Sequence, residues 1–228
     1  HRSGRWACLS FMFLPLASAE TASDMPRNCT FSEGDWTVLS QFWHPIAFAH
    51  EITDKPVPAR LLDVDLVIWR TPQGVSVARD LCPHRGTRIS AGRVDGDQLI
   101  CPMHGLHFDA AGQCTKIPSN PDQDARVSTR LRLQLLRCEE RYGLLWTSLS
   151  QDPIWTIPER PGIRDDSLKR VYIPPNTWNA AASRHVENFN DVAHFPWVHK
   201  DTFGGSEEDR FPSYDVLETE YGLTFDLG

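Results

Sequence analysis

The sequence has little positive charge and no long apolar run. Lysine and arginine number 23 against 30 aspartates and glutamates, so the net charge is -7. Such a chain offers no broad cationic surface for nucleic acid. The longest uncharged apolar stretch, residues 6–19, is shorter than the roughly 20 residues that a membrane-spanning helix needs. We therefore expect no nucleic-acid partner and no membrane span.

The sequence also lacks internal repeats and low-complexity segments, and its composition excludes wholesale disorder. Its 228 residues are 40% hydrophobic and 23% charged, as in globular proteins that bury roughly 70% of their unfolded surface. At about 150 residues per domain, this length predicts one large domain or two modest ones. Two of the six cysteines lie beside histidines at metal-ligand spacing, which favours metal binding in a reducing compartment over disulfides.

Residues 1–30 differ from the rest, and we interpret them as an N-terminal extension. Basic residues precede an apolar run that ends in Ala17-Ser18-Ala19, a pattern typical of secretory cleavage sites. The chain opens on histidine, and Met25 begins a segment that leads into the predicted fold, so an upstream extension or non-native leader is the alternative. The sequence has no twin-arginine pair, which would suit export of a folded cofactor protein.

Short β-type runs separated by turn residues predict an antiparallel, all-β domain over residues 31–150. The runs cover residues 61–69, 75–78, 98–100, 130–136 and 144–147. Three prolines mark residues 151–166 as a linker. Residues 167–228 form a second region, with a predicted helix over 183–194 and two strands within 214–227. About sixty residues are too few for an independent catalytic domain, so we expect part of this domain to be missing.

One cysteine and one histidine lie in each of two loops rich in proline and glycine. The first loop reads CPHRG from Cys82, and the second reads CPMHG from Cys101. Asp95-Gly96 between them is a strong turn signal, so a hairpin can bring the two loops together. Four candidate metal ligands then converge on one point: Cys82, His84, Cys101 and His104.

The order of these ligands distinguishes an iron–sulfur cluster from a zinc site. A structural zinc finger usually takes both cysteines from one loop and both histidines from another, whereas each loop of this chain gives one of each. The mixed order is typical of a Rieske [2Fe-2S] cluster, in which two thiolates hold one iron and two imidazoles hold the other. Neutral imidazoles raise the reduction potential above that of all-cysteine clusters. A zinc knuckle and a metal-free loop pair are the alternatives.

A second group of candidate ligands follows the linker. Asp191, His194 and His199 stand in the pattern D-x-x-H-x-x-x-x-H. On a regular helix Asp191 and His194 lie about 60° apart, but His194 and His199 diverge by about 140°. We expect Pro196 to break or kink the helix and to bring His199 back toward a shared metal. Two histidines and a carboxylate are the ligands of non-haem Fe(II) oxygenases, and ordinary helix-end histidines are the alternative.

Together these two groups resemble the oxygenase α-subunit of Rieske non-haem iron oxygenases, from about Trp36 onward. Segment 187–199 is most similar to the group that includes phenoxybenzoate and chlorobenzoate dioxygenases, toluenesulfonate monooxygenase and vanillate demethylase. The resemblance implies an all-β Rieske domain followed by an α+β catalytic domain, an antiparallel sheet with covering helices. It further implies a role for each of four residues: iron ligation by His194 and His199, a bridge between metal centres by Asp191, and an active-site position for Asn188. The family's third iron ligand is a carboxylate expected farther downstream.

The activity that the resemblance implies is hydroxylation or oxidative O-demethylation of an aromatic compound with dioxygen. The implied cofactors are a [2Fe-2S] cluster and a mononuclear Fe(II), with electrons from a reductase that uses NAD(P)H. The implied assembly is a cytoplasmic homotrimer. Two rivals remain: a Rieske ferredoxin would need only the residues up to about 150, and a structural zinc module would have no turnover. Met103 departs from the tyrosine usual in the second loop of the family.

Overall fold

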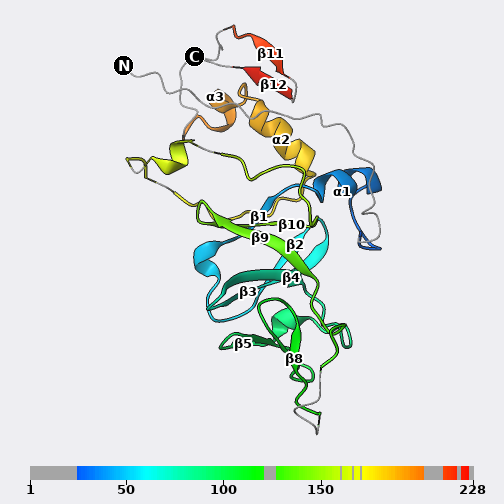
Figure 1. Cartoon of the computed structure of the whole chain (residues 1–228). Helices are drawn as coiled ribbons and strands as arrows, with labels where there is room; N and C mark the ends of the chain where they lie inside the picture. The colour runs from blue at the N-terminus through cyan, green and yellow to red at the C-terminus, as the bar shows by residue number, and fades with distance from the viewer. Residues whose placement is uncertain are drawn as a thin grey trace. The chain divides into compact units, whose positions relative to one another are not determined.

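The computed structural model describes residues 25–120, 127–159, 161–165, 167–169, 171–202, 213–219 and 222–225. Its contacts divide the chain into two compact units, with the division after Lys169. Within these ranges, no helix is long and apolar enough to cross a membrane. The first unit holds two β-sheets, and the second holds two helices and a β-hairpin (Figure 1).

A six-stranded antiparallel sheet forms the body of the first unit, in the order β1-β10-β9-β4-β3-β2 (Figure 1). Its strands are β1 (His44–Phe48), β2 (Val57–Leu61), β3 (Val64–Thr71), β4 (Gly74–Arg79), β9 (Leu135–Arg141) and β10 (Leu144–Ser148). β3 is buried almost throughout because its alternating side chains enter two different cores. Val67 and Trp69 enter the core that contains Cys82 and Cys101, which we call the ligand-side core. The alternate residues of β3, Val64, Leu66 and Ile68, enter the opposite core.

A four-stranded antiparallel sheet, β5-β6-β7-β8, lies beside the two ligand loops. It consists of β5 (Arg93–Asp95), β6 (Gln98–Ile100), β7 (His107–Phe108) and β8 (Cys114–Lys116). β5 and β6 form the expected hairpin, with Asp95 opposite Gln98 and Gly96 at φ +60° in the turn. Glycine adopts this left-handed conformation without steric cost. The inner face of the sheet completes the ligand-side core with Leu99, Phe108 and Cys114.

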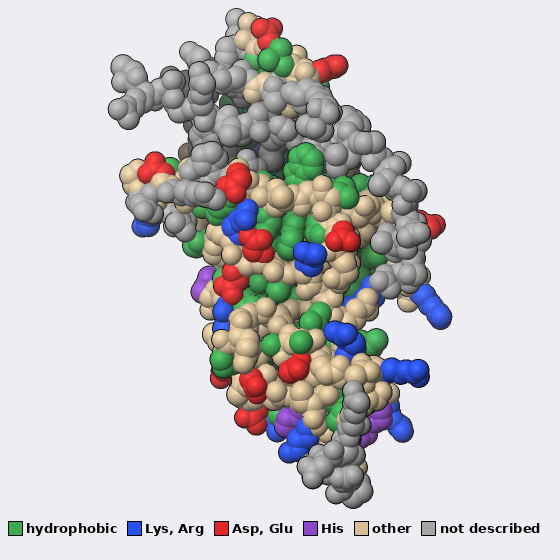
Figure 2. All heavy atoms as spheres, viewed as in Figure 1, with side chains coloured by type: hydrophobic (Ala, Val, Ile, Leu, Met, Phe, Trp, Pro, Cys, Tyr) green, Lys and Arg blue, Asp and Glu red, His purple; other side chains and the backbone are tan. Residues whose placement is uncertain are grey.

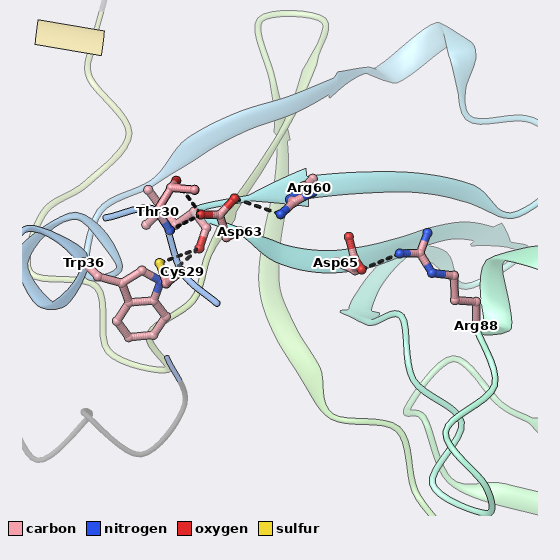
Figure 3. Close-up of polar contacts among 8 residues, drawn as sticks. Cys29, Thr30, Trp36, Arg60, Asp63, Asp65 and Arg88 are labelled. Carbon is pink, nitrogen blue, oxygen red and sulfur yellow. Dashed lines mark hydrogen bonds and ion pairs between the residues drawn. The ribbon is translucent and has the colours of Figure 1, made fainter. Parts of the chain in front are cut away.

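The segment before β1 packs against the opposite core. Helix α1 (Glu33–Leu39) buries Trp36 there, and Trp36 donates from Nε1 to the backbone carbonyl of Leu62 at 3.0 Å. Upstream, Thr30 donates both its backbone N–H and its hydroxyl to one carboxylate oxygen of Asp63, at 2.7 and 2.6 Å (Figure 3). These contacts fasten the N-terminal segment to the turn between β2 and β3.

Two of the predicted strands differ from those in the structure. The run 61–69 is not one strand, because Leu62 and Asp63 have φ of 46° and 64° and turn the chain between β2 and β3. The run 130–136 is also wrong, since the regular strand begins only at Leu135. The runs 75–78, 98–100 and 144–147 are confirmed as parts of β4, β6 and β10.

The second unit contains two short helices and a hairpin. α2 (Ala182–Asn190) and α3 (Phe195–Val198) are separated by an irregular turn, and β11 (Val216–Thr219) pairs antiparallel with β12 (Gly222–Phe225). The hairpin confirms the two strands expected within 214–227. The helix expected over 183–194 is shorter than predicted, because Asp191 takes extended backbone angles after Asn190. A mostly β unit that begins with helix α1, followed by a unit of helices and strands, agrees with the predicted fold class.

Candidate metal centres

The first ligand loop connects β4 to a short 3-10 helix, η3 (Ile89–Ala91). Two backbone hydrogen bonds close it: Cys82 N–H donates to Thr87 O at 2.8 Å, and Gly86 N–H donates to Cys82 O at 2.9 Å. Gly86 has φ +70°, a conformation that an L side chain rarely adopts. The loop therefore turns back on itself at Gly86, two residues after the candidate ligand His84.

The second ligand loop connects β6 to β7 and repeats this backbone pattern. Cys101 N–H donates to Leu106 O at 2.9 Å, and Gly105 N–H donates to Cys101 O at 3.0 Å. Gly105 has φ +68°, almost the value of the glycine in the first loop. Each loop thus holds its cysteine at the start of a tight turn and its histidine near the apex.

The four predicted ligands come together as an inner pair of thiols and an outer pair of imidazoles. Cys82 and Cys101 are each 2% exposed and belong to the ligand-side core. His84 and His104 are exposed, with ring centroids 4.8 Å apart and ring planes at 64°. Figure 2 shows histidine side chains at the surface of the region that carries the β5–β8 sheet in Figure 1.

Burial determines the protonation of Cys82. Desolvation raises the pKa of the Cys82 thiol to about 11, and the neighbouring Cys101 thiol adds to the rise. The Cys82 thiol is therefore protonated at neutral pH without a metal. A metal centre held by Cys82 would have to displace this proton.

The pairing of donors fits a two-iron cluster. A Rieske cluster needs two thiolates on one iron and two imidazoles on the other, which matches a buried thiol pair beside an exposed imidazole pair. A single tetrahedral ion needs its donors around one point. A buried thiol pair beside an exposed imidazole pair therefore fits a two-iron cluster better than a single zinc ion.

A contact between the two loops was missed at the level of the sequence. The hydroxyl of Thr87 in the first loop lies 3.0 Å from the sulfur of Met103 in the second, and Met103 is 57% exposed. Methionine sulfur is a weak acceptor, so this contact adds modestly to the joining of the loops. The methionine noted as a departure from the family pattern is thus the residue that meets the opposite loop.

The second group of candidate ligands surrounds the turn between α2 and α3. The side chain of Asp191 accepts a hydrogen bond from Ala193 N–H at 2.9 Å, which stabilises a local turn and ends α2. The predicted break at Pro196 is therefore wrong. Pro196 lies in the first turn of α3, where a helix needs no N–H donor. The break falls between Asp191 and His194.

His194 and His199 cap the two ends of the one-turn helix α3. Their ring centroids are 5.2 Å apart, so the structure brings together the two histidines that a continuous helix would separate. Nδ1 of His194 lies 3.4 Å from Oδ2 of Asp191, an ion-pair distance, although the atoms are not aligned as a hydrogen bond. Asn188 is exposed on α2, one helical turn before Asp191.

Two regions of the chain match models of known protein families. Residues 42–134 match the Rieske [2Fe-2S] domain, and residues 178–226 match the vanillate O-demethylase oxygenase C-terminal domain. The first match contains both ligand loops, and the second contains Asp191, His194 and His199.

Curated proteins and solved structures also match most of this chain. Methylxanthine N1-demethylase NdmA of Pseudomonas putida is 34% identical over 171 residues, which cover 72% of this chain and 48% of that protein. The oxygenase component of dicamba O-demethylase from Stenotrophomonas maltophilia is 30% identical over 81% of this chain and 52% of its own length. A solved structure of NdmA from P. putida CBB5 superposes with a TM-score of 0.72 and 31% identity, over 80% of this chain and 57% of that chain.

The chain spans about half the length of the curated relatives it matches. Within that span, the buried thiol pair, the exposed imidazole pair and the histidines around α3 fall inside the two matched domains. The order of the two domains along the chain is also the order expected from the sequence. The chain belongs to the Rieske non-haem iron oxygenases.

Proposed function

We propose that this chain is the oxygenase component of a Rieske-type aromatic oxygenase. It uses dioxygen and electrons from a reductase to hydroxylate an aromatic compound or to remove a methyl group from it oxidatively. The observation that carries the proposal is the presence, in one chain, of two paired Cys/His loops and of a histidine pair flanked by a carboxylate. Relatives named as demethylases of methylxanthine, dicamba and dehydrodivanillate support a methylated aromatic substrate.

Each ligand residue has its own task in this proposal. When bound, the [2Fe-2S] cluster supplies one-electron transfer and the mononuclear iron supplies dioxygen activation. Cys82 and Cys101 lose their protons and keep one side of the cluster in the apolar core. His84 and His104 hold the opposite side at the protein surface, where electrons can enter or leave. The closed turns of both loops fix these donors before binding, which lowers the entropy cost of assembling the site.

The carboxylate of Asp191 positions His194. Because it faces Nδ1, the proton of a neutral imidazole is favoured on that nitrogen, and Nε2 is left to bind iron. His199 provides the second imidazole from the other end of α3. The third ligand in this proposal is a carboxylate from the remaining part of the oxygenase domain. Asn188, one turn before Asp191, lines the substrate side of the site.

We further propose that three copies of the enzyme form a closed ring, in which the carboxylate of Asp191 connects the iron site of one copy with His104 of the next. The electron donor is a reductase that uses NAD(P)H, and the enzyme works in the cytoplasm, where iron–sulfur clusters are inserted. Residues 31–150 and 167–228 are proposed as the Rieske domain and the catalytic region, joined by a linker over 151–166.

The proposal is tested on protein reconstituted anaerobically with iron and sulfide. We expect a coloured protein whose reduced form gives the low average g-value of a mixed Cys/His cluster in electron paramagnetic resonance. The full-length enzyme should hold more than two irons per chain and release formaldehyde from a methoxylated or N-methylated aromatic compound. A colourless, zinc-binding protein would support the structural module, and two irons per chain without turnover would support the ferredoxin.

A further inference from the structure

A buried carboxylate closes the first ligand loop at its base. Asp80 follows β4 directly and is 4% exposed. One of its carboxylate oxygens accepts a hydrogen bond from Ser90 N–H at 2.7 Å, and the other accepts one from the Ser90 hydroxyl at 2.6 Å. The backbone N–H of Asp80 donates to the carbonyl of Asp65 in β3 at 2.9 Å. Asp80 thus joins the six-stranded sheet to η3.

The residues enclosed by this contact include both metal ligands of the loop. Cys82 and His84 lie between Asp80 and Ser90 in the sequence. The two backbone hydrogen bonds of the loop form an inner turn, and the contact between Asp80 and Ser90 forms an outer ring around it. Loss of a hydrogen bond from a buried polar group costs more than loss of an exposed one, because the remaining partner is left without water. The outer ring therefore resists opening of the loop.

The end of the first loop also touches the strand that leads into the second. Gly92 follows η3, and a Cβ atom at this position would lie 2.0 Å from the backbone oxygen of Ile100. Only glycine permits so close an approach. Ile100 is the last residue of β6 and directly precedes Cys101. A displacement of Ser90 and η3 would therefore change how the first loop sits against the start of the second.

We infer that Asp80 is a positioning residue for the cluster ligands. Its carboxylate accepts both hydrogen bonds of Ser90 and thereby fixes the position of the first loop next to β6. Cys82 then stays beside Cys101, and His84 beside His104, before metal binds. Asp80 ligates nothing itself and acts through η3 and Gly92. This role deepens the proposed function and rests on it for one point, the identity of the [2Fe-2S] cluster as the group that the two loops bind.

The first experiment measures hydrogen exchange of the metal-free chain, with Asp80→Asn and Ser90→Ala as variants. An amide at position 80 keeps one accepting oxygen but replaces the second by an NH2 donor and removes the charge, so exchange in residues 80–92 should become about tenfold faster. Ser90→Ala keeps the N–H donor and should give a smaller acceleration. If Asp80→Asn fails to fold, Ser90→Ala still decides. Unchanged exchange of residues 80–92 in a folded variant would overturn the inference.

The chain offers a matched control in Asp63→Asn. The carboxylate of Asp63 also accepts the N–H and the hydroxyl of a single residue, Thr30, but at the turn between β2 and β3 (Figure 3). Asp63→Asn thus replaces a carboxylate by an amide, as Asp80→Asn does, but at a position away from both ligand loops. Its effect on exchange should be confined to residues 25–36 and 57–66. Acceleration in 80–92 as large as that of Asp80→Asn would indicate general destabilisation and contradict the positioning role.

The second experiment measures the reduction potential, the paramagnetic resonance spectrum and the rate of cluster loss after reconstitution. We expect Asp80→Asn to broaden the spectrum, shift the potential and lose its cluster several-fold faster than the wild type, with Asp63→Asn unchanged. Wild-type values in Asp80→Asn would overturn the inference. A wild-type chain that assembles no Rieske cluster would refute the proposed function instead, while the exchange experiment would still decide the role of Asp80 in the loop.

Discussion

Asp63 and Asp80 each accept hydrogen bonds from the backbone N–H and the hydroxyl of one residue, Thr30 and Ser90 respectively. The two carboxylates differ in burial and in the segments that they join. Asp80 is buried between sheet and ligand loop, whereas Asp63 stands at the solvent-facing turn between β2 and β3. Hydrogen bonds from the Thr30 hydroxyl and then from its N–H lower the pKa of Asp63, and Arg60 at 2.9 Å adds to the effect. The charge of Asp63 therefore strengthens the attachment of the N-terminal segment to the sheet.

We predict that Asp63→Asn lowers the free energy of unfolding at pH 7 by about 1 kcal/mol, a value reduced for solvent screening. Because the folded pKa lies below the unfolded one, the stabilisation by Asp63 is complete above about pH 4 and is lost as the pH falls through the folded pKa. Urea unfolding at pH 7 and pH 3 measures the difference in free energy of unfolding between variant and wild type. This difference should be smaller at pH 3 than at pH 7.

Asp97→Asn is the control for the change of charge. Asp97 lies in the exposed turn between β5 and β6 and accepts a hydrogen bond only from its neighbour Gln98, at 3.1 Å, among the contacts described for it. Its effect on the free energy of unfolding should be small at both pH values. A loss in Asp63→Asn that is as large at pH 3 as at pH 7 would mean that the contact does not depend on charge.

At the scale of the element, α3 is a single helical turn with a candidate iron ligand at each end. His194 precedes its first residue and His199 follows its last. Pro196 lies in the first turn, where backbone N–H groups have no partner inside the helix, so proline costs nothing there and pre-sets the backbone. The upstream turn at Asp191 separates α3 from α2.

We predict that Pro196→Ala leaves the pair of histidines in place. The helix break lies upstream of His194, so removal of the proline should neither fuse α2 with α3 nor change the far-UV circular dichroism. The free energy of unfolding should fall by about 0.5–1 kcal/mol, because the unfolded chain gains freedom. Iron content at the second site of the full-length enzyme should be unchanged. A rise in helix content with loss of iron would instead support a break made by Pro196.

Local patterns were predictable from the sequence, and contacts between distant residues were not. The four ligands of the first centre are visible because each loop contains its own cysteine, histidine and turn glycine. The contact of Asp80 with Ser90 is not visible, because it depends on where β4 and η3 end. The turn at Leu62-Asp63 was missed because it contains no glycine or proline. The sequence predicts a helix break at Pro196, whereas in the structure the side chain of Asp191 accepts a hydrogen bond from the backbone N–H of Ala193 and α2 ends there.

At the scale of the whole molecule, the two candidate centres belong to different compact units of the chain. In the proposed function electrons pass between the centres, which requires a connection between a ligand of one centre and a ligand of the other. In the proposed ring of three copies, Asp191 makes that connection across an interface between neighbours. A monomer would then hold both centres but connect them poorly.

We predict that Asp191→Asn in the full-length enzyme keeps the cluster and most of the iron but slows electron transfer at least tenfold. Asparagine retains the oxygen that accepts from Ala193 N–H, so the turn that ends α2 should survive. It loses the negative charge beside Nδ1 of His194, and such outer partners of a ligand typically affect activity by 10- to 100-fold. Single-turnover reduction and oxidation of the two centres measures the rate.

Glu187→Gln is the matched control, since it removes a carboxylate one turn earlier on α2. The side chain of Glu187 forms an exposed ion pair with Arg184 at 2.6 Å, which contributes little to stability. Transfer between the centres should be as fast in this variant as in the wild type, and analytical ultracentrifugation should show the same assembly in all three proteins. If Asp191→Asn transferred electrons at the wild-type rate, or if a monomer were fully active, the carboxylate would not connect the centres, and its role would be limited to ending α2 and orienting His194.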